Sequence, residues 1–166
     1  MVVAAPQRRA TGCEPAEARI WQALRTVMDP EIPVLSVVEL GIVRHVRAQA
    51  DGRIHVGLTP TYSGCPATEV IREAVRRVLD EHGFDDVVLD AVLSPPWSSE
   101  WLSQEGRAKL LAFGIAAPEA RETEPVACPR CASRDTERLS EFGSTPCKAH
   151  HRCRACGEPF DRFKCL

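Results

Sequence analysis

Two Cys-x-x-Cys pairs near the end of the chain place the strongest constraint on its fold. The pairs are Cys128 with Cys131 and Cys153 with Cys156, and 21 residues lie between them. A tight turn in each pair brings two thiolates to one ion, and a hairpin between the pairs would complete a tetrahedral shell of four sulfurs. Four protein ligands leave no open position, so we expect one structural zinc per chain. A single iron would also fit an all-sulfur site of this kind.

The composition is that of a folded protein with two parts. A chain of 166 residues has room for one ordinary core and a small appended module. It contains no apolar run long enough to span a membrane, and residues 1–14, which we expect to be disordered, lack a signal-peptide pattern. We therefore expect a cytoplasmic protein without a membrane partner. In that compartment, eight cysteines indicate metal or redox chemistry rather than disulfides.

The charge is distributed unevenly. Residues 127–166 carry eight Lys or Arg residues and five Asp or Glu residues, whereas the whole chain has a net charge of −2. Four thiolates on a divalent metal would add two negative charges to this basic segment and make it nearly neutral. Because nucleic-acid binding depends on neutralising phosphates, we expect no nucleic-acid partner.

The apolar pattern predicts alternating helices and strands before the cysteine pairs. The turn Asp51-Gly52 separates two alternating runs and predicts a hairpin. Helical spacing of apolar residues is followed by Gly83, a typical C-cap. The predicted elements are a helix from residue 15 to before Asp29, strands over 42–50 and 53–62, a helix over 67–82, a strand over 87–93, and a helix from Ser98 or Ser99 to Gly114.

This order predicts an α/β protein. Residues 15–114 would form a small two-layer domain of the order α-β-β-α-β-α. Residues 115–126 lose the apolar periodicity and gain proline and charge, so we interpret them as a linker. Residues 127–166 would form the four-cysteine zinc ribbon.

Cys65 stands directly before Pro66, at the predicted start of the second helix. Unpaired N–H groups and the helix dipole favour a thiolate there, and such a thiolate can bind a metal or act as a nucleophile. A free cysteine is also often a small buried apolar residue, and that interpretation stays open. The stiff loop Asp29-Pro-Glu-Ile-Pro33 could bring Asp29 and Glu31 to Cys65 as oxygen ligands or proton acceptors. The alternative is a solvated turn capped by Asp29.

Cys147 and Cys165 lie outside the two pairs. If the two domains fold back on each other, these residues could join Cys65 in holding iron or an iron–sulfur cluster. The alternative is that both pack as small apolar residues against neighbouring phenylalanines.

Several motifs resemble known proteins. The loop Asp29 to Pro33, the motif Glu39-Leu-Gly41 and the motif Thr61-Tyr-Ser-Gly-Cys-Pro66 resemble the small α/β domain of iron–sulfur cluster assembly factors, the FSCA or SufT-like group. Together with Pro95-Pro-Trp-Ser-Ser-Glu-Trp101 and the segments 142–148 and 158–165, residues 15–166 are similar to the PaaD (PaaJ) family.

The resemblance implies a role in aerobic phenylacetate degradation. It implies an accessory protein, not catalytic alone, that assists iron–sulfur cluster assembly or insertion in the reductase component of the phenylacetyl-CoA epoxidase, a multicomponent monooxygenase. The reductase and oxygenase components would be its partners. Cys65 matches the cysteine tied to cluster transfer, and Asp29 to Glu31 match a signature loop. The alternative is a structural interaction subunit of the oxygenase without a metal-transfer role.

Overall fold

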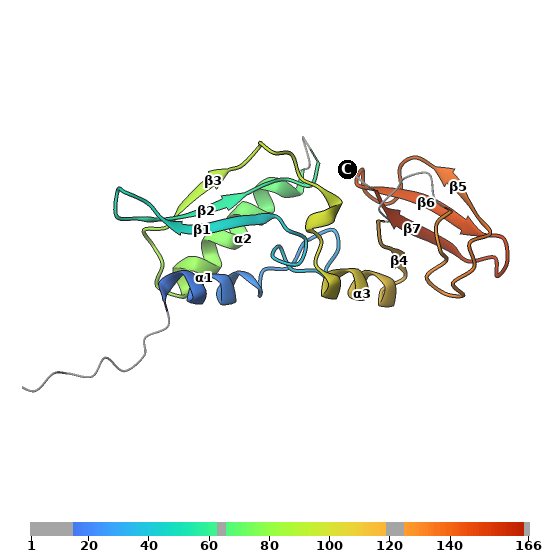
Figure 1. The fold of residues 1–166 in the computed structure, drawn as a ribbon, viewed down its shortest axis with the longest axis horizontal. Helices are drawn as coiled ribbons and strands as arrows, with labels where there is room; N and C mark the ends of the chain where they lie inside the picture. Colours follow the sequence, from blue (N-terminus) through green and yellow to red (C-terminus); the bar gives the residue numbers. More distant parts are fainter. Residues whose placement is uncertain (1–14, 63–65, 119–124, 165–166) are drawn as a thin grey trace, which may run out of the picture.

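The computed structural model describes residues 15–62, 66–118 and 125–164. Cys13, Cys65 and Cys165 lie outside the described residues. Figure 1 shows two modules side by side along the long axis, an N-terminal module with a three-stranded sheet and a ribbon with a four-stranded sheet. The predicted α/β fold class with a C-terminal ribbon is confirmed.

The sheet of the N-terminal module begins with the predicted hairpin. β1 (Val43–Ala48) and β2 (Ile54–Leu58) pair antiparallel, and β3 (Val88–Ala91) pairs parallel with β2. Gly52 in the turn has φ +83, a conformation that glycine adopts without strain. Both hairpin strands are shorter than predicted. β2 ends before Pro60, which cannot donate a hydrogen bond to a ladder, and β1 contains a register shift between Val43 and His45.

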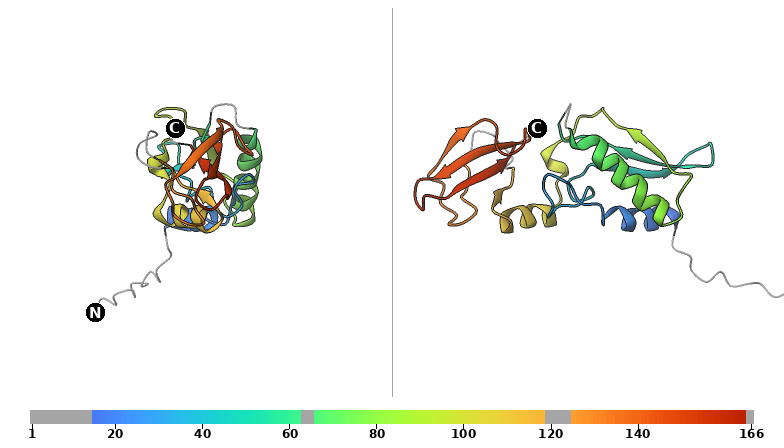
Figure 2. Two further views of the ribbon diagram at one scale, coloured as in Figure 1. Left: turned by 90° about the vertical axis from the view of Figure 1, so that its right-hand side faces the viewer. Right: turned by 180° about the vertical axis from the view of Figure 1, so that it is seen from behind.

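Two helices form the second layer of this module. α1 (Ala16–Leu24) packs against α2 (Ala67–Glu81) and β1, and α2 lies in front of the sheet in the rear view of Figure 2. α2 buries Ile71, Val75 and Leu79 at helical spacing, as predicted. Its N-cap is Pro66. None of the helices in these described ranges combines the length and apolar character that crossing a membrane requires.

The predicted last helix is divided into two pieces. A 3-10 turn, η1 (Ser99–Trp101), precedes α3 (Gln104–Ala112). Ser98 caps η1 by accepting a hydrogen bond from the Glu100 N–H, and Ser103 caps α3 by accepting one from the Gly106 N–H. Leu102 has an extended backbone, and Ser103 then begins a separate helix. The prediction of one continuous helix was therefore wrong.

The ribbon sheet has the strand order β4-β7-β6-β5. Its strands are β4 (Ile115–Ala116), β5 (Thr136–Ser140), β6 (Lys148–Cys153) and β7 (Pro159–Phe163). β4 pairs parallel with β7, although we predicted a linker over residues 115–126. The first two residues of that range therefore belong to the ribbon sheet. They supply hydrogen-bond partners to the backbone of β7 on the side that faces away from β6.

The two modules share a buried cluster. Cys147 and Phe163 from the ribbon are buried in the same cluster as Leu40 and Trp97 of the N-terminal module. The Trp97 indole Nε1 donates a hydrogen bond to the Leu40 carbonyl oxygen at 2.8 Å. The ribbon is thus packed on the N-terminal module, with one end of β6 and β7 at the junction.

Candidate metal site and the cavity between the modules

Each cysteine pair occupies a tight turn closed by backbone hydrogen bonds. The Ala132 N–H donates to the Cys128 carbonyl, and the Gly157 N–H donates to the Cys153 carbonyl, both at 2.9 Å. Ala132 and Gly157 have φ values of 59 and 78, so each turn ends in a left-handed residue. This geometry points both thiols of a pair to the same side.

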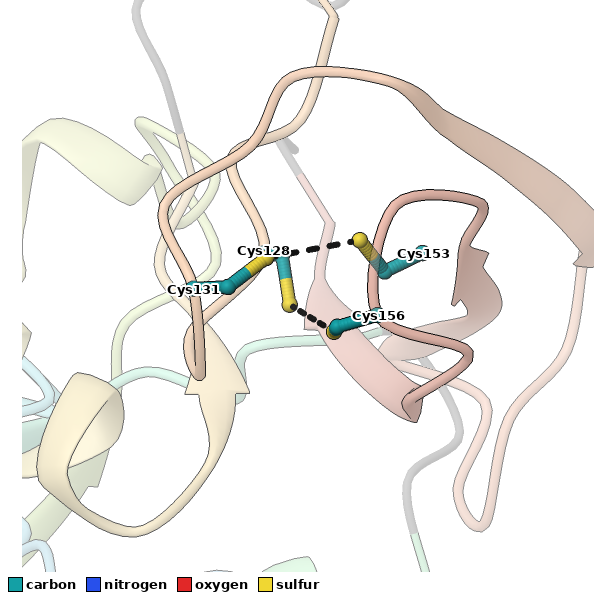
Figure 3. A group of neighbouring side chains, drawn as sticks. All are labelled: Cys128, Cys131, Cys153 and Cys156. Atoms are coloured by element: carbon teal, nitrogen blue, oxygen red, sulfur yellow. Dashed lines mark hydrogen bonds between the residues drawn. The ribbon is translucent and has the colours of Figure 1, made fainter.

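The four thiols converge as the spacing predicted. Figure 3 shows the side chains pointing toward one another, with Cys128 Sγ 3.8 Å from Cys156 Sγ and Cys131 Sγ 3.6 Å from Cys153 Sγ. All four sulfurs lie within 4.8 Å of one another. Tetrahedral Zn–S bonds of about 2.3 Å place sulfurs about 3.8 Å apart, whereas a disulfide requires about 2.05 Å. The arrangement fits a metal-binding site and excludes disulfides within this group.

Four thiols at this distance cannot all ionise without a cation. Burial opposes ionisation of Cys153, but the Cys156 backbone N–H and the Cys131 thiol outweigh it and lower the pKa of Cys153 to about 7. The Glu158 backbone N–H favours a Cys156 thiolate, but burial and the neighbouring thiols raise the pKa of Cys156 to about 12. A divalent ion would remove this conflict by neutralising the shared charge.

Polar contacts outside the thiol group hold the two turns together. Arg130 of the first turn donates from Nη1 to Glu158 Oε2 at 2.5 Å, just beyond the second turn. The Arg154 backbone N–H donates to the Asp135 carbonyl at 2.9 Å. Glu137 on β5 accepts from both Arg152 and Arg154. These contacts fix the orientation of the thiols from outside the sulfur shell.

The Asp29 loop lies at the other end of the ribbon. The backbone N–H groups of Glu31 and Ile32 donate to Asp29 Oδ1 at 2.8 and 2.7 Å, so Asp29 caps the chain reversal, as in the alternative interpretation of this loop. It is not solvated, however, because only 7% of the residue is exposed. Burial raises the pKa of Asp29, although the backbone N–H groups of Ile32 and Glu31 and the charge of Lys148 act to lower it.

Glu31 meets a cysteine of the ribbon. Its Oε2 lies 4.0 Å from Cys147 Sγ, and Thr145 Oγ1 lies 3.1 Å from the same sulfur. Cys147 is 5% exposed and belongs to the buried cluster that includes Phe163. Its burial beside Phe163 agrees with the interpretation of Cys147 as a small apolar packing residue, and the role of Cys147 as an iron ligand stays a prediction.

A cavity of about 130 Å³ opens beside this contact. Its wall is mainly apolar, with Ile71 of α2 and Phe163 of β7 among the residues that line it. Its polar lining includes Asp29, Glu31 and Cys147, together with Glu69, Arg72 and three threonines. An apolar hollow with a few convergent polar groups is the usual candidate for a binding site, although this one is smaller than most ligand pockets.

The predicted site residues thus fall into three groups. The structure brings Cys128, Cys131, Cys153 and Cys156 together, and separately brings Glu31 to Cys147 beside Asp29. Cys65 and Cys165 lie outside the described residues, although Thr61 and Thr68, on either side of Cys65 in the sequence, both line the cavity. The sequence analysis missed Lys148, which is only 4% exposed and stands next to Cys147. The available signal was the position of Lys148 directly after Cys147, a candidate ligand.

Family models match both modules. Residues 17–87 match the model described as iron-sulfur cluster assembly protein, and residues 116–164 match the model described as PaaD zinc beta ribbon domain. A solved structure from Bacillus anthracis, described as a domain of unknown function DUF59, covers 57% of this chain and 90% of its own length at 30% identity, with a TM-score of 0.52. The fold and the four-cysteine site define an iron–sulfur assembly domain joined to a metal-binding ribbon.

Relatives that are similar over most of the chain identify the family within this class of proteins. A protein of Escherichia coli (strain K12), provisionally named as a component of the 1,2-phenylacetyl-CoA epoxidase, is 46% identical over 165 residues, which cover 96% of this chain and 99% of the relative. An Fe-S protein maturation auxiliary factor of Porphyromonas gingivalis is 40% identical over 95 residues, 57% of this chain and 90% of the relative. The chain belongs to the PaaD family.

Proposed function

We propose that this chain is an accessory maturation factor for a phenylacetyl-CoA epoxidase. It would assist assembly or insertion of the iron–sulfur cluster in the reductase component during aerobic phenylacetate degradation, without catalytic activity of its own. One observation carries the proposal: a chain similar over its length to a protein named as an epoxidase component also has an assembly-type domain with a thiol and three carboxylates at one cavity.

The ribbon would hold one structural zinc through Cys128, Cys131, Cys153 and Cys156. Sulfur separations of 3.6 and 3.8 Å support zinc, because they match the spacing of about 3.8 Å in a tetrahedral thiolate shell. Four protein ligands leave no position for a substrate, so this metal would stabilise the ribbon and take no part in transfer.

Iron or an iron–sulfur cluster would be the cargo, held transiently by Cys65, Cys147 and Cys165. Support for Cys65 comes from its place before α2 and from the cavity-lining Thr61 and Thr68 on either side of it in the sequence. Support for Cys147 comes from its position at the same cavity, beside Glu31. A mixed thiolate and carboxylate environment is suited to labile iron.

Anaerobic reconstitution with iron and sulfide tests this function. Wild-type protein should develop a visible iron–sulfur chromophore and then transfer it to the apo-reductase component. Cys65→Ser should weaken the chromophore while bound zinc persists. Equal iron uptake and equal activation of the reductase by the Cys65→Ser variant would exclude the assignment of Cys65, and failure of wild-type protein to activate the reductase would exclude the function.

The second candidate function is a structural interaction subunit of the oxygenase. Tyr62, an aromatic residue that is 42% exposed, favours it, since tyrosine is enriched among the residues that dominate interface energetics. Co-purification separates the two functions. A lasting stoichiometric complex with the oxygenase would support the structural role, whereas a transient complex with the reductase would support the maturation factor.

A further inference from the structure

The outer edge of the N-terminal sheet is covered by side chains only along the first part of β3. β3 is the last strand of that sheet (Figure 1), so its outward backbone groups have no neighbouring strand. Arg76 Nη2 donates to the Val87 carbonyl at 2.6 Å, and Arg72 Nη2 donates to the Leu89 carbonyl at 3.1 Å. Charged side chains often protect an exposed sheet edge in this way. Two arginines of α2 thus occupy the outward carbonyls up to Leu89.

The next two outward residues, Ala91 and Leu93, have no such cover. The Val92 N–H donates to the Leu58 carbonyl at 2.7 Å, so the backbone groups of the residues on either side of Val92 point away from β2. In the part of the chain that the structure describes, no hydrogen bond reaches the backbone of Ala91 or Leu93 on this side. An unpaired edge of this kind is a template for one more strand.

A hollow adjoins this open edge. Its volume is about 360 Å³, within the range of about 300 to 1,000 Å³ that is usual for ligand pockets. Among its lining residues, Leu93 is 72% exposed and Tyr62 is 42% exposed, whereas Trp97 is buried. Pro60 and Pro96 restrict the backbone of the two segments that line it, so little ordering is needed on binding. Exposed apolar side chains around a hollow are typical of interaction sites.

The charges at the neighbouring cavity indicate the kind of partner. The hollow and the cavity of about 130 Å³ share four lining residues, so the two adjoin. Asp29, Glu31 and Glu69 line the cavity with three carboxylates, whereas Arg72 is the one Lys or Arg residue that lines it. Carboxylates outnumber cations even when Lys148, whose charge acts on Asp29, is included. A partner segment that carries Lys or Arg is therefore favoured over an acidic one.

We propose that the open edge at Ala91 and Leu93, together with the hollow beside it, forms a groove that binds an extended basic segment of a partner protein. The segment pairs with the backbone of Ala91 and Leu93, places an apolar side chain in the hollow and directs Lys or Arg toward Glu69. In this mode of recognition, main-chain hydrogen bonds supply affinity and the pocket supplies specificity. The interpretation of the partner as the client that receives a cluster rests on the proposed function.

A synthetic peptide is the probe. It has about seven residues, mostly threonine for strand propensity, with one central leucine and two lysines. Fluorescence anisotropy follows its titration with full-length, zinc-loaded protein. Leu93→Ser should weaken binding at least about tenfold, because it removes an exposed apolar contact. The matched control is Leu111→Ser on α3, since Leu111 is 52% exposed and lines neither hollow, and its affinity should stay within about twofold of wild type.

A second peptide tests the charge preference. It carries two glutamates in place of the lysines and should bind wild-type protein at least about tenfold more weakly than the lysine peptide. Glu69→Gln should reduce this preference, because it removes one of the three carboxylates at the cavity. Leu93 and Glu69 are both exposed, so neither variant should lose its fold, and thermal unfolding checks this.

Backbone pairing has its own readout. Amide hydrogen exchange at Leu93, measured by NMR on isotope-labelled protein, should become slower when the lysine peptide is bound, because an N–H group in a ladder is protected. Two more peptides are N-methylated on alternate residues. Methylation of the amides that face β3 should weaken binding at least about tenfold, whereas methylation of the other set should leave it within about twofold.

Three results would each overturn the groove. They are wild-type affinity in Leu93→Ser, equal binding of the lysine and glutamate peptides, and equal binding of both methylated peptides. Sedimentation of the protein without peptide tests a second copy of the chain as the occupant. A dimer that Leu93→Ser dissociates would overturn the assignment to a partner protein.

The outcomes separate the groove from the proposed function. If Leu93→Ser loses the peptide but activates the apo-reductase as well as wild type does, the groove is supported and its role in client binding is contradicted. If wild-type protein binds the peptide but does not activate the reductase, the groove is supported and the maturation role is contradicted.

Discussion

The rings of Trp97 and Phe163 meet edge to face, with centroids 5.7 Å apart and planes at 67°. Trp97 belongs to the N-terminal module and Phe163 ends β7 of the ribbon, so this contact joins the modules. Both side chains are buried, and edge-to-face aromatic pairs contribute about 0.5 to 1.5 kcal/mol beyond their buried area. Phe163 is therefore one of the buried contacts that fix the relative position of the two modules.

Phe163→Ala should destabilise the protein by about 3 to 5 kcal/mol, because it removes a buried ring and leaves a cavity at the junction. Urea unfolding measures the loss. Phe142→Ala is the control, since Phe142 is 60% exposed and should change stability by less than about 1 kcal/mol. Equal midpoints for the two variants would show that the modules do not depend on the Trp97 contact.

Loss of a ribbon thiol should unfold the ribbon and spare the N-terminal module. Cys153→Ser removes one of four ligands, so bound zinc should fall well below one per chain, as after chelation. The helical signal of α2 should persist in far-UV circular dichroism, because its core contains no ribbon thiol of the metal site. Cys147→Ser should retain zinc. Retention of zinc by Cys153→Ser instead would show that this thiol is not a required ligand.

Glu39 should make stability fall in acid. Burial acts to raise the pKa of Glu39, but hydrogen bonds from Lys109 and from Ser36 outweigh it and lower the pKa. Because the pKa of Glu39 is lower in the folded protein than its ordinary value of 4.5, the ionised carboxylate stabilises the fold at any pH above 4.5. This stabilisation is lost as the pH falls through the pKa of the folded state. Glu39→Gln should lower Tm at about pH 7 and flatten its decline toward about pH 3.

The control for Glu39 uses the same lysine. Glu105 Oε1 lies 3.1 Å from Lys109 Nζ, but its side chain is exposed, and exposed ion pairs contribute about 0 to 1 kcal/mol. Glu105→Gln should leave the acid dependence of Tm almost unchanged. A decline as steep in Glu39→Gln as in wild type would mean that another carboxylate causes the acid sensitivity.

Gly41→Ala should be strongly destabilising. A Cβ atom at this position would lie 2.7 Å from Trp101 Cβ and 2.8 Å from the Trp101 carbonyl oxygen, and the residue has φ +70. Gly52 has φ +83 but open space around it, so Gly52→Ala introduces only backbone strain of about 1 to 2 kcal/mol. Thermal unfolding should show a larger decrease in Tm for Gly41→Ala than for Gly52→Ala, and the difference between the two decreases measures the clash with Trp101. Equal losses would show that η1 moves away freely.

Asp29→Asn should maintain or raise stability at neutral pH. Burial raises the pKa of Asp29 above the ordinary 3.8, so Asp29 stabilises the fold at low pH and this contribution is lost as the pH rises through the folded pKa. An asparagine keeps the oxygen that accepts from Glu31 and Ile32 without the buried charge. Tm at neutral pH checks this. A large decrease would mean that Lys148 requires the Asp29 charge.

Local patterns were sufficient to predict the metal site and most elements. The Cys-x-x-Cys turns depend on contacts within a few residues, and the Asp51-Gly52 hairpin is likewise local, so both follow from short-range chemistry. The break between η1 and α3 was missed because Ser98, Ser99 and Ser103 are all good caps, and only packing decides which ones begin a helix.

Long-range contacts could not be predicted in the same way. Glu31 and Cys147 are 116 positions apart, and their approach depends on how the ribbon packs on the N-terminal module. The burial of Lys148 follows from the same packing and contradicts the usual exposure of lysine. The two-residue pairing of β4 with β7 is too short to give any periodic signal in the sequence.

The pairing of β4 with β7 has a practical consequence for anyone who wishes to isolate the ribbon. A fragment that starts at residue 127 would lack Ile115 and Ala116, and β7 would become an uncovered edge strand. Open edges invite pairing between molecules, so such a fragment should self-associate even with its metal bound. A fragment that starts before Ile115 would keep that edge covered.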